Sequence, residues 1–148
     1  MGIVTAWIIS FNFILSGQYL SRKHNWFGAY PDHQILALAL LPAVFALAIG
    51  IGWAAKTRHF SQNIDGSPPA EGTPLDITLR YIQNTLEQLV LFAAACFCLH
   101  SSAPEISRTV LPILGLWFFI ARMMFWFGYK RAPLSRAIGF ANRTRRAK

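Results

Sequence analysis

The chain has 148 residues, of which 54% are hydrophobic and 14% charged, roughly half the charged share of about 25% in a typical soluble domain. A soluble protein of this size needs charged side chains to cover its surface, so this composition excludes a water-soluble globular domain. The formal net charge of +8 must therefore be explained within a membrane protein.

Four apolar stretches follow one another along the chain, and each is close to the roughly 20 residues with which a helix spans a hydrocarbon layer of about 30 Å. We predict an all-α fold, an integral membrane four-helix bundle that forms a single transmembrane domain over residues 1–148. The expected helices cover residues 2–20, 35–55, 79–99 and 110–130, and a basic cytoplasmic tail covers residues 131–148.

The first apolar stretch is not a signal peptide by its pattern, because it lacks a basic start and a small-x-small cleavage site. The segment between the second and third stretches contains Gly66-Ser67-Pro68-Pro69 and Gly72-Thr73-Pro74, which predicts a loop. We expect Asp76 or Thr78 to cap the helix that follows this loop.

The basic residues are concentrated at the carboxyl terminus, where no acidic residue accompanies them. Seven of the fourteen follow position 129: Lys130, Arg131, Arg136, Arg143, Arg145, Arg146 and Lys148. Because basic residues favour the cytoplasmic side, we expect a multi-pass protein with both termini in the cytoplasm and a tail that faces the headgroups of membrane lipids. Nucleic acid is not an expected partner, since no basic module interleaved with aromatic residues is present.

Two of the expected helices carry ionisable residues, each of which costs roughly 2.5–3.5 kcal/mol inside a membrane and so needs a partner or a purpose. In the third helix Arg80, Asn84 and Glu87 fall within about 60° of one another on a helical wheel, with Gln83 beside them. The fourth helix carries Arg122 and Tyr129, seven residues apart on one face.

Two interpretations of these residues remain open. In the structural one, Glu87 pairs with Arg122 across the bundle while Asn84 and Gln83 form hydrogen bonds between helices. In the other, they line a polar pocket for a charged, peptide-like ligand, whose carboxylates and amine need such donors and a carboxylate acceptor. No metal site is expected, because the Cys96-x-Cys98 pair lacks a second pair or a set of histidines.

The pattern Arg80-x3-Asn84-x2-Glu87, together with Ala121-Arg122-x6-Tyr129, resembles the MAPEG family, the membrane-associated proteins in eicosanoid and glutathione metabolism; the resemblance covers roughly residues 35–140. It implies a homotrimer that holds glutathione between neighbouring subunits near the cytoplasmic face. The glutathione-binding residues that it implies are Arg80, Gln83, Asn84, Glu87, Arg122 and Tyr129. It also implies that Arg136 lies beside the glutathione sulfur as the catalytic residue, and Arg58 could match an arginine that some members place in a loop.

The sequence departs from the family pattern in two places. Phe125 stands where some family enzymes have Tyr or His, so one hydrogen bond to the ligand is lost. The chain also has an additional apolar stretch at its amino terminus, residues 2–20, in place of the family's last helix. Our hypothesis is that this stretch fills the place of that helix.

The predicted function is a membrane-bound glutathione-dependent transferase or peroxidase. Glutathione would be the co-substrate, and lipophilic electrophiles would reach the enzyme from the bilayer. The alternative is a non-catalytic MAPEG-like protein that binds lipid or acts as a scaffold. A carrier of ions or protons, using Glu87 and Arg122 as a relay, is disfavoured because the polar residues gather toward one membrane face.

Overall fold

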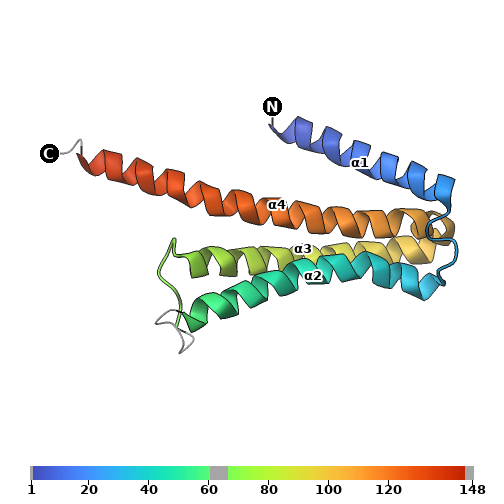
Figure 1. The fold of residues 1–148 in the computed structure, drawn as a ribbon, viewed down its shortest axis with the longest axis horizontal. Coiled ribbons are helices and arrows are strands. Elements are labelled where there is room, and N and C mark those ends of the chain that lie inside the picture. The colour runs from blue at the N-terminus through green and yellow to red at the C-terminus, as the bar shows by residue number, and fades with distance from the viewer. Residues whose placement is uncertain (1, 61–66, 146–148) are drawn as a thin grey trace.

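The computed structural model describes residues 2–60 and 67–145, with the side chains of residues 2–4, 6 and 129–145 outside the description. The described chain forms the helices α1 (Gly2–His24), α2 (Asp32–His59), α3 (Pro74–Ser102) and α4 (Pro104–Arg145), and these described residues include no strand. The prediction of an all-α four-helix fold is confirmed (Figure 1).

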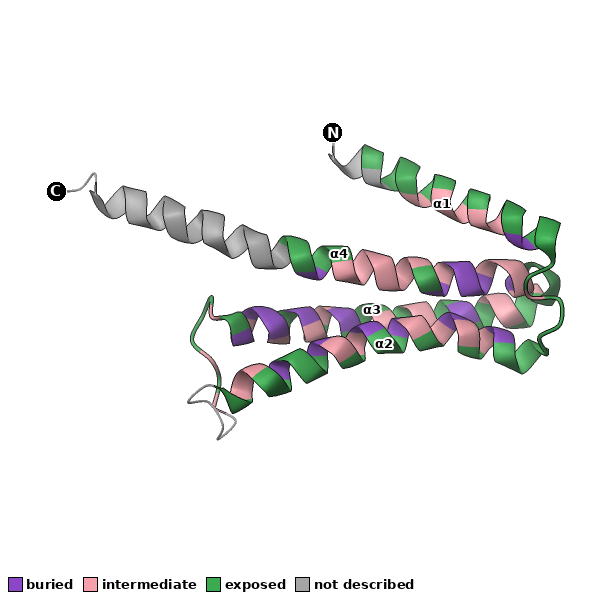
Figure 2. Ribbon diagram, in the orientation of Figure 1, coloured by how far each residue is buried: buried purple, intermediate pink, exposed green. Residues whose placement is uncertain are grey.

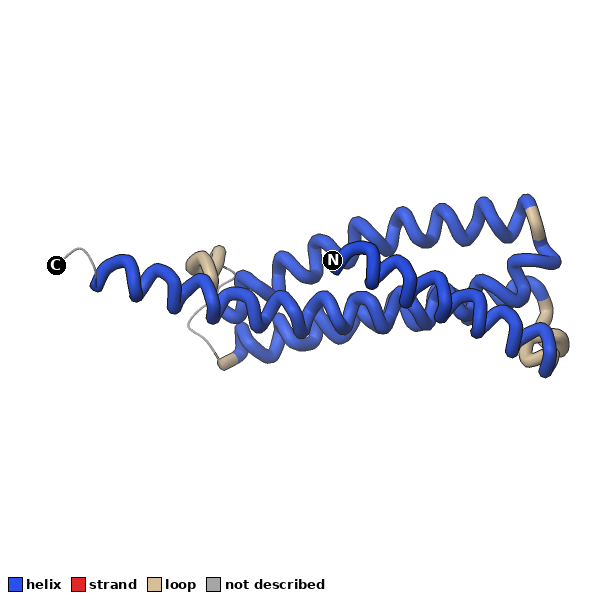
Figure 3. Tube along the Cα trace, turned by 90° about the horizontal axis from the view of Figure 1, so that it is seen from above, coloured by secondary structure: helices blue, strands red, loops and turns tan. Residues whose placement is uncertain are grey.

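The chain runs back and forth, so that the start of α1 and the end of α4 point toward the end of the molecule that carries the α2–α3 connection (Figure 1). The connections gather at the two ends of the bundle (Figure 3). Helices α2, α3 and α4 all pack against one another, whereas within the described chain α1 packs against α4 alone. The half-buried residues of α1 lie on the side that faces α4 (Figure 2).

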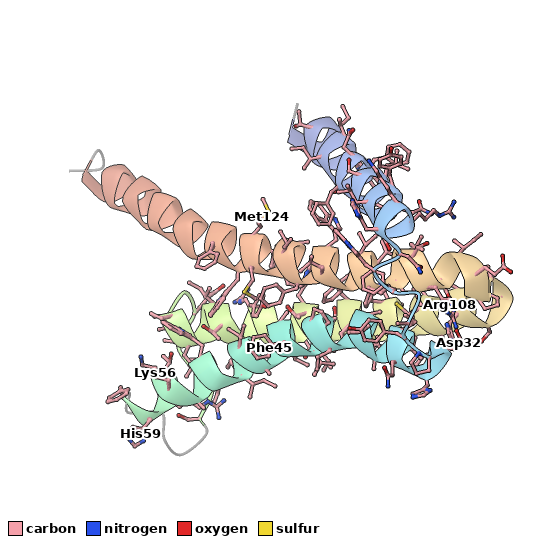
Figure 4. The ribbon with its side chains drawn as sticks, turned by 45° about the vertical axis from the view of Figure 1, so that its right-hand side comes forward. Asp32, Phe45, Lys56, His59, Arg108 and Met124 are labelled. Carbon is pink, nitrogen blue, oxygen red and sulfur yellow. The ribbon has the colours of Figure 1, made fainter. Side chains whose placement is uncertain are left out.

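Three of the helical segments are long and apolar enough to cross a membrane: Asp32–His59, Pro74–Ser102 and Pro104–Gly128. Large apolar side chains point outward from them, as a lipid-facing surface requires. Phe45 of α2 is 59% exposed and Met124 of α4 is 66% exposed (Figure 4). Within the described residues α1 does not meet the same limits of length and apolarity, and its crossing of the membrane stays a prediction.

Small residues on the buried face of α2 let the other two helices of the core approach closely. These residues are Ala39, Ala43, Ala46, Gly50 and Ala54. A Cβ atom added at Gly115 of α4 would collide with the carbonyl oxygen of Ala39, and one added at Gly50 would lie 2.7 Å from the ring of Tyr81 in α3. The glycines at these two positions therefore set the spacing of the bundle.

The core has a different character at each end. Toward the start of α2, Ile35 and Ala39 pack with Cys96 and Leu111. The ion pair between Asp32 and Arg108, with 2.8 Å between Oδ1 and Nη2, joins the starts of α2 and α4 there (Figure 4). Toward the other end the core is aromatic, and this end carries the candidate site.

The helix ends differ from the expectations. The cap of α3 is Thr73, whose side chain accepts a hydrogen bond from the backbone N–H of Asp76 at 3.3 Å, so the prediction of Asp76 or Thr78 as the cap is wrong. Helix α2 continues to His59 and includes Arg58 in its last turn, so Arg58 does not lie in a loop. The backbone of α4 continues to Arg145 through the segment expected as a tail, which is rich in the good helix formers Arg and Ala.

Candidate functional site

A row of polar side chains runs along the outward face of α3. Arg80, Gln83 and Glu87 are exposed, and Asn84 beside them is half-buried toward α4. The row begins with two ion pairs of Arg80, from its Nε to Asp76 Oδ1 at 3.1 Å and from its Nη2 to Glu71 Oε1 at 3.5 Å. Asp76 is itself held in place, because its Oδ2 accepts a hydrogen bond from the backbone N–H of Gly72 at 2.9 Å.

The far end of the row is formed by Gln83 and Glu87. The side-chain amide of Gln83 donates a hydrogen bond to Glu87 Oε1 at 2.8 Å, one helical turn along. This bond uses one of the oxygens of the Glu87 carboxylate, and the side chain remains exposed. Glu87 therefore presents acceptor capacity to the outside of the helix bundle.

Arg122 lies between α3 and α4, where its Nη1 donates a hydrogen bond to Asn84 Oδ1 at 2.8 Å. Its guanidinium carbon lies 5.7 Å from the ring centre of Phe118 and 5.2 Å from that of Phe125, within the range of cation–π attraction. Its partner across the bundle is thus Asn84. The structural interpretation is wrong in pairing Arg122 with Glu87, but the hydrogen bond between helices that it expected of Asn84 is present. Phe125, which cannot donate the expected hydrogen bond to a ligand, instead gives Arg122 an aromatic face.

The polar row extends far along a helix that is expected to span the membrane, so the exposure of its charged residues needs an explanation. Glu87 is thirteen residues into α3, roughly 20 Å from its start at 1.5 Å per residue. A carboxylate at this position of a spanning helix is costly if it faces hydrocarbon. The outward face of the row must therefore meet water, a ligand or another protein surface.

An aromatic cluster behind the row holds α3 in its orientation. The buried Tyr81 donates a hydrogen bond from its hydroxyl to the carbonyl oxygen of Ala46 at 3.0 Å. Its ring stacks on Trp126 at 5.2 Å between centroids, and Trp126 meets the edge of Trp53 at 5.7 Å. Because this cluster ties α3 to both α2 and α4, it fixes the rotation of the helix, and Arg80, about 100° away from Tyr81 around the axis, is directed outward.

Sequence reasoning missed the acidic partners of Arg80 and the anchoring role of Tyr81. One of the two acidic partners was predictable from the sequence. Asp76 precedes Arg80 by four residues, the spacing at which an acid and a base meet on a helix. Glu71 had no such signal, since it approaches Arg80 from the loop. Within the described residues no group of three His, Cys, Asp or Glu side chains is placed to hold a metal ion.

Two of the expected site residues, Tyr129 and Arg136, have side chains outside the described part of the chain. Their backbones belong to α4. At 1.5 Å per residue Tyr129 is roughly 10 Å and Arg136 roughly 21 Å along that helix from Arg122, in the direction of the end where α3 begins. The structure thus joins Gln83 to Glu87 and Asn84 to Arg122, whereas Arg80, on the same side of α3, is bonded to Asp76. The contacts of Tyr129 and Arg136 lie outside the described part of the chain.

Comparison with known protein families covers the helices that carry the polar row. The model of the MAPEG family matches residues 34–143, which cover most of α2, all of α3 and most of α4. No curated protein and no solved structure matches the chain. The match spans the whole polar row as well as Arg122, Tyr129 and Arg136. The chain therefore belongs to the MAPEG family of membrane-associated proteins in eicosanoid and glutathione metabolism.

Proposed function

We propose that the protein is a membrane-bound glutathione-dependent transferase or peroxidase that acts on lipophilic electrophiles from the bilayer. The observation that carries this proposal is the outward polar row on α3, a set of charged and amide side chains exposed on a helix that otherwise has the composition of a membrane span. Such a surface needs a polar partner, and a charged tripeptide is a partner of matching chemistry.

The length of the row suits this ligand. Arg80 and Glu87 are seven residues apart, roughly 10 Å along the helix axis, and three extended residues of a peptide span about 10 Å. Glutathione carries two carboxylates and one ammonium group. In the proposal the arginines and the amides of Gln83 and Asn84 bind its carboxylate and peptide groups, and Glu87 accepts hydrogen bonds from its ammonium.

In the free protein Arg80 forms ion pairs with Asp76 and Glu71. A carboxylate of glutathione must therefore replace one of these partners in order to bind Arg80. The ion pair with Glu71 is the weaker of the two, because it is longer at 3.5 Å and the Glu71 side chain is 90% exposed. Exposed ion pairs of this kind contribute about 0–1 kcal/mol. A carboxylate of glutathione can therefore replace Glu71 at small cost, while Asp76 continues to orient the guanidinium.

We further propose that the site is completed by a second copy of the chain in a homotrimer. Beside the polar row, α3 exposes the large apolar residues Leu86, Val90 and Leu91. A neighbouring subunit packed on this face would cover them and shield the row from lipid. Light scattering of the purified protein, corrected for bound detergent, gives the number of chains, and three per particle is expected.

The proposed reaction begins with the thiolate of glutathione. The sulfur attacks the electrophilic carbon, a C–S bond forms, and the leaving group departs with the electron pair. With a hydroperoxide the thiolate attacks the terminal oxygen, the O–O bond breaks, and the alkoxide leaves and takes up a proton to give the alcohol, so that the sulfur becomes a sulfenic acid. The thiol of a second glutathione then attacks this sulfur and displaces its hydroxyl group, which gives the glutathione disulfide and water. A free thiol with a pKa of about 8.5 is mostly protonated at neutral pH, so a cation that lowers this pKa favours both reactions.

Arg136 is our proposal for that cation. Because its backbone is roughly 21 Å from Arg122 along a straight α4, this role needs either a bend at Pro133 or the Arg136 of a neighbouring subunit. Proline is a common site of helix bends. In the same proposal, both termini lie in the cytoplasm, which supplies glutathione to this end of the bundle.

Turnover by the purified protein tests the proposal. The protein in detergent or in phosphatidylcholine vesicles is supplied with glutathione and either a chromogenic aryl halide or an alkyl hydroperoxide. Product formation that saturates with glutathione and exceeds the uncatalysed rate is expected. The second candidate, a non-catalytic family member, is favoured by Phe125, which packs against Arg122 where some family enzymes have Tyr or His. Glutathione binding without turnover of either substrate would assign the protein to it.

A further inference from the structure

A cavity lies between the last turns of α2 and the start of α3, at the end of the bundle where the polar row begins. Its volume is about 530 Å³, within the range of about 300–1,000 Å³ that is usual for ligand sites. It is lined by the last turns of α2, by the loop and by the first turn of α3: Trp53, Lys56, Thr57, Phe60, Pro69, Ala70, Thr73, Pro74 and Leu75.

The lining has one charged group on mostly apolar walls. Lys56 supplies the charge, and its ammonium lies 5.5 Å from the ring centre of Trp53. None of the described residues places a carboxylate within ion-pair distance of Lys56, and no acidic residue is among the lining residues. The nearby Asp76 is engaged by Gly72 and Arg80. Within residues 2–60 and 67–128, the positive charge of the cavity therefore has no counter-ion.

The position of the cavity matches the boundary between lipid and water. It lies where the spanning helix α2 ends, beside the basic last turn that contains Lys56 and His59 (Figure 4). Trp53 at 41% and Phe60 at 80% exposure present aromatic rings there, as is common at membrane interfaces. Basic residues in a last turn also complement the helix dipole, but this does not explain an apolar cavity beside them.

From this arrangement we propose that the cavity is a binding site for one anionic phospholipid. The phosphate group accepts hydrogen bonds from the ammonium of Lys56, and the glycerol and first part of an acyl chain lie against Trp53, Phe60 and Leu75. The apolar walls select a lipid over a free phosphate ion, and the charge selects an anionic lipid over a zwitterionic one. None of the residues that line this cavity belongs to the proposed glutathione-binding residues.

Native mass spectrometry of the full chain tests the proposal. The protein in detergent is equilibrated with equal amounts of phosphatidylglycerol and phosphatidylcholine, and the lipids retained per chain are counted. Preferential retention of phosphatidylglycerol is expected. Lys56→Gln should lower this preference about five-fold, the effect of one lysine near an anionic headgroup. Lys23→Gln is the matched control, because Lys23 is an exposed residue in the last turn of α1, at the opposite end of the bundle.

A second variant tests whether the space of the cavity is needed, without changing its charge. Ala70→Trp fills the space from an exposed loop position and leaves every charge in place, so it should also reduce retention. Basic residues near the carboxyl terminus attract anionic lipid as well, which is why differences between variants are the measured quantity. Equal loss in Lys56→Gln and Lys23→Gln, unchanged retention in Ala70→Trp, or displacement of phosphatidylglycerol by the same concentration of inorganic phosphate would each overturn the proposal.

Discussion

Replacing Glu87 by Gln removes one negative charge from the polar row with minimal change of shape. The carbonyl oxygen of the new side chain can still accept the hydrogen bond that Gln83 donates at 2.8 Å. Arg122 keeps its own partner, because it is bonded to Asn84 and not to Glu87. The substitution therefore affects chiefly what meets Glu87 from outside the subunit.

The expected loss of glutathione affinity follows from the bond that disappears. A hydrogen bond between a carboxylate and an ammonium contributes about 1–3 kcal/mol, and about 1.4 kcal/mol corresponds to a factor of ten in Kd. Glu87→Gln should raise the Kd for glutathione roughly 5- to 150-fold. The free energy of unfolding should change by less than about 0.5 kcal/mol, since Glu87 is exposed.

Isothermal titration of both proteins in the same detergent measures the two dissociation constants, and light scattering reports the oligomer. Glu105→Gln is the matched control, because Glu105 is an exposed carboxylate in the first turn of α4, at the opposite end of the bundle. An intact oligomer of Glu87→Gln that binds glutathione as tightly as the unmodified protein would remove Glu87 from the site. If Glu87→Gln loses the oligomer but each folded chain binds glutathione as tightly as before, Glu87 has a structural role in the contact between chains.

Three further predictions concern packing, topology and mechanism. Gly115→Ala should destabilise the bundle by about 1–3 kcal/mol because the added Cβ collides with the carbonyl of Ala39, whereas Gly52→Ala meets no atom within 4 Å; equal thermal unfolding midpoints in detergent would contradict this. A reporter active only in the periplasm, in a bacterial host, should be active when inserted in the 21–33 loop and inactive at the carboxyl terminus, and the reverse pattern would invert the proposed orientation. Arg136→Ala should leave glutathione affinity within a few-fold and move ionisation of the bound thiol to higher pH, followed by thiolate absorbance at about 240 nm; an unchanged midpoint would assign Arg136 to the lipid surface.

The sequence was sufficient to predict the four helices and the polar row on one face of α3. Apolar stretches of about 20 residues reveal spans directly, and a helical wheel places Arg80, Asn84 and Glu87 on one side of a single helix. The sequence could not show which of these three residues faces a neighbouring helix. Asn84 and Glu87 differ by about 60° on the wheel, and in the structure this difference turns Asn84 toward Arg122 and leaves Glu87 exposed.

The parts of the site that the sequence did not predict depend on contacts between distant segments. Glu71 reaches Arg80 from a loop, and Tyr81 is fixed by a carbonyl of α2 and by a ring of α4. The space for the Tyr81 ring exists because Gly50 lacks a side chain. No periodic pattern within one helix predicts these contacts, because they depend on how the helices cross.

The central claim is that the outward row on α3 binds glutathione, and equilibrium dialysis of the purified, detergent-solubilised protein against radiolabelled glutathione tests it most directly. We predict saturable binding that approaches one glutathione per chain, as expected if each subunit contributes one row, and release of the label by unlabelled glutathione but not by free glutamate at the same concentration. Absence of saturable binding by a protein that elutes as a folded, uniform oligomer would contradict the claim.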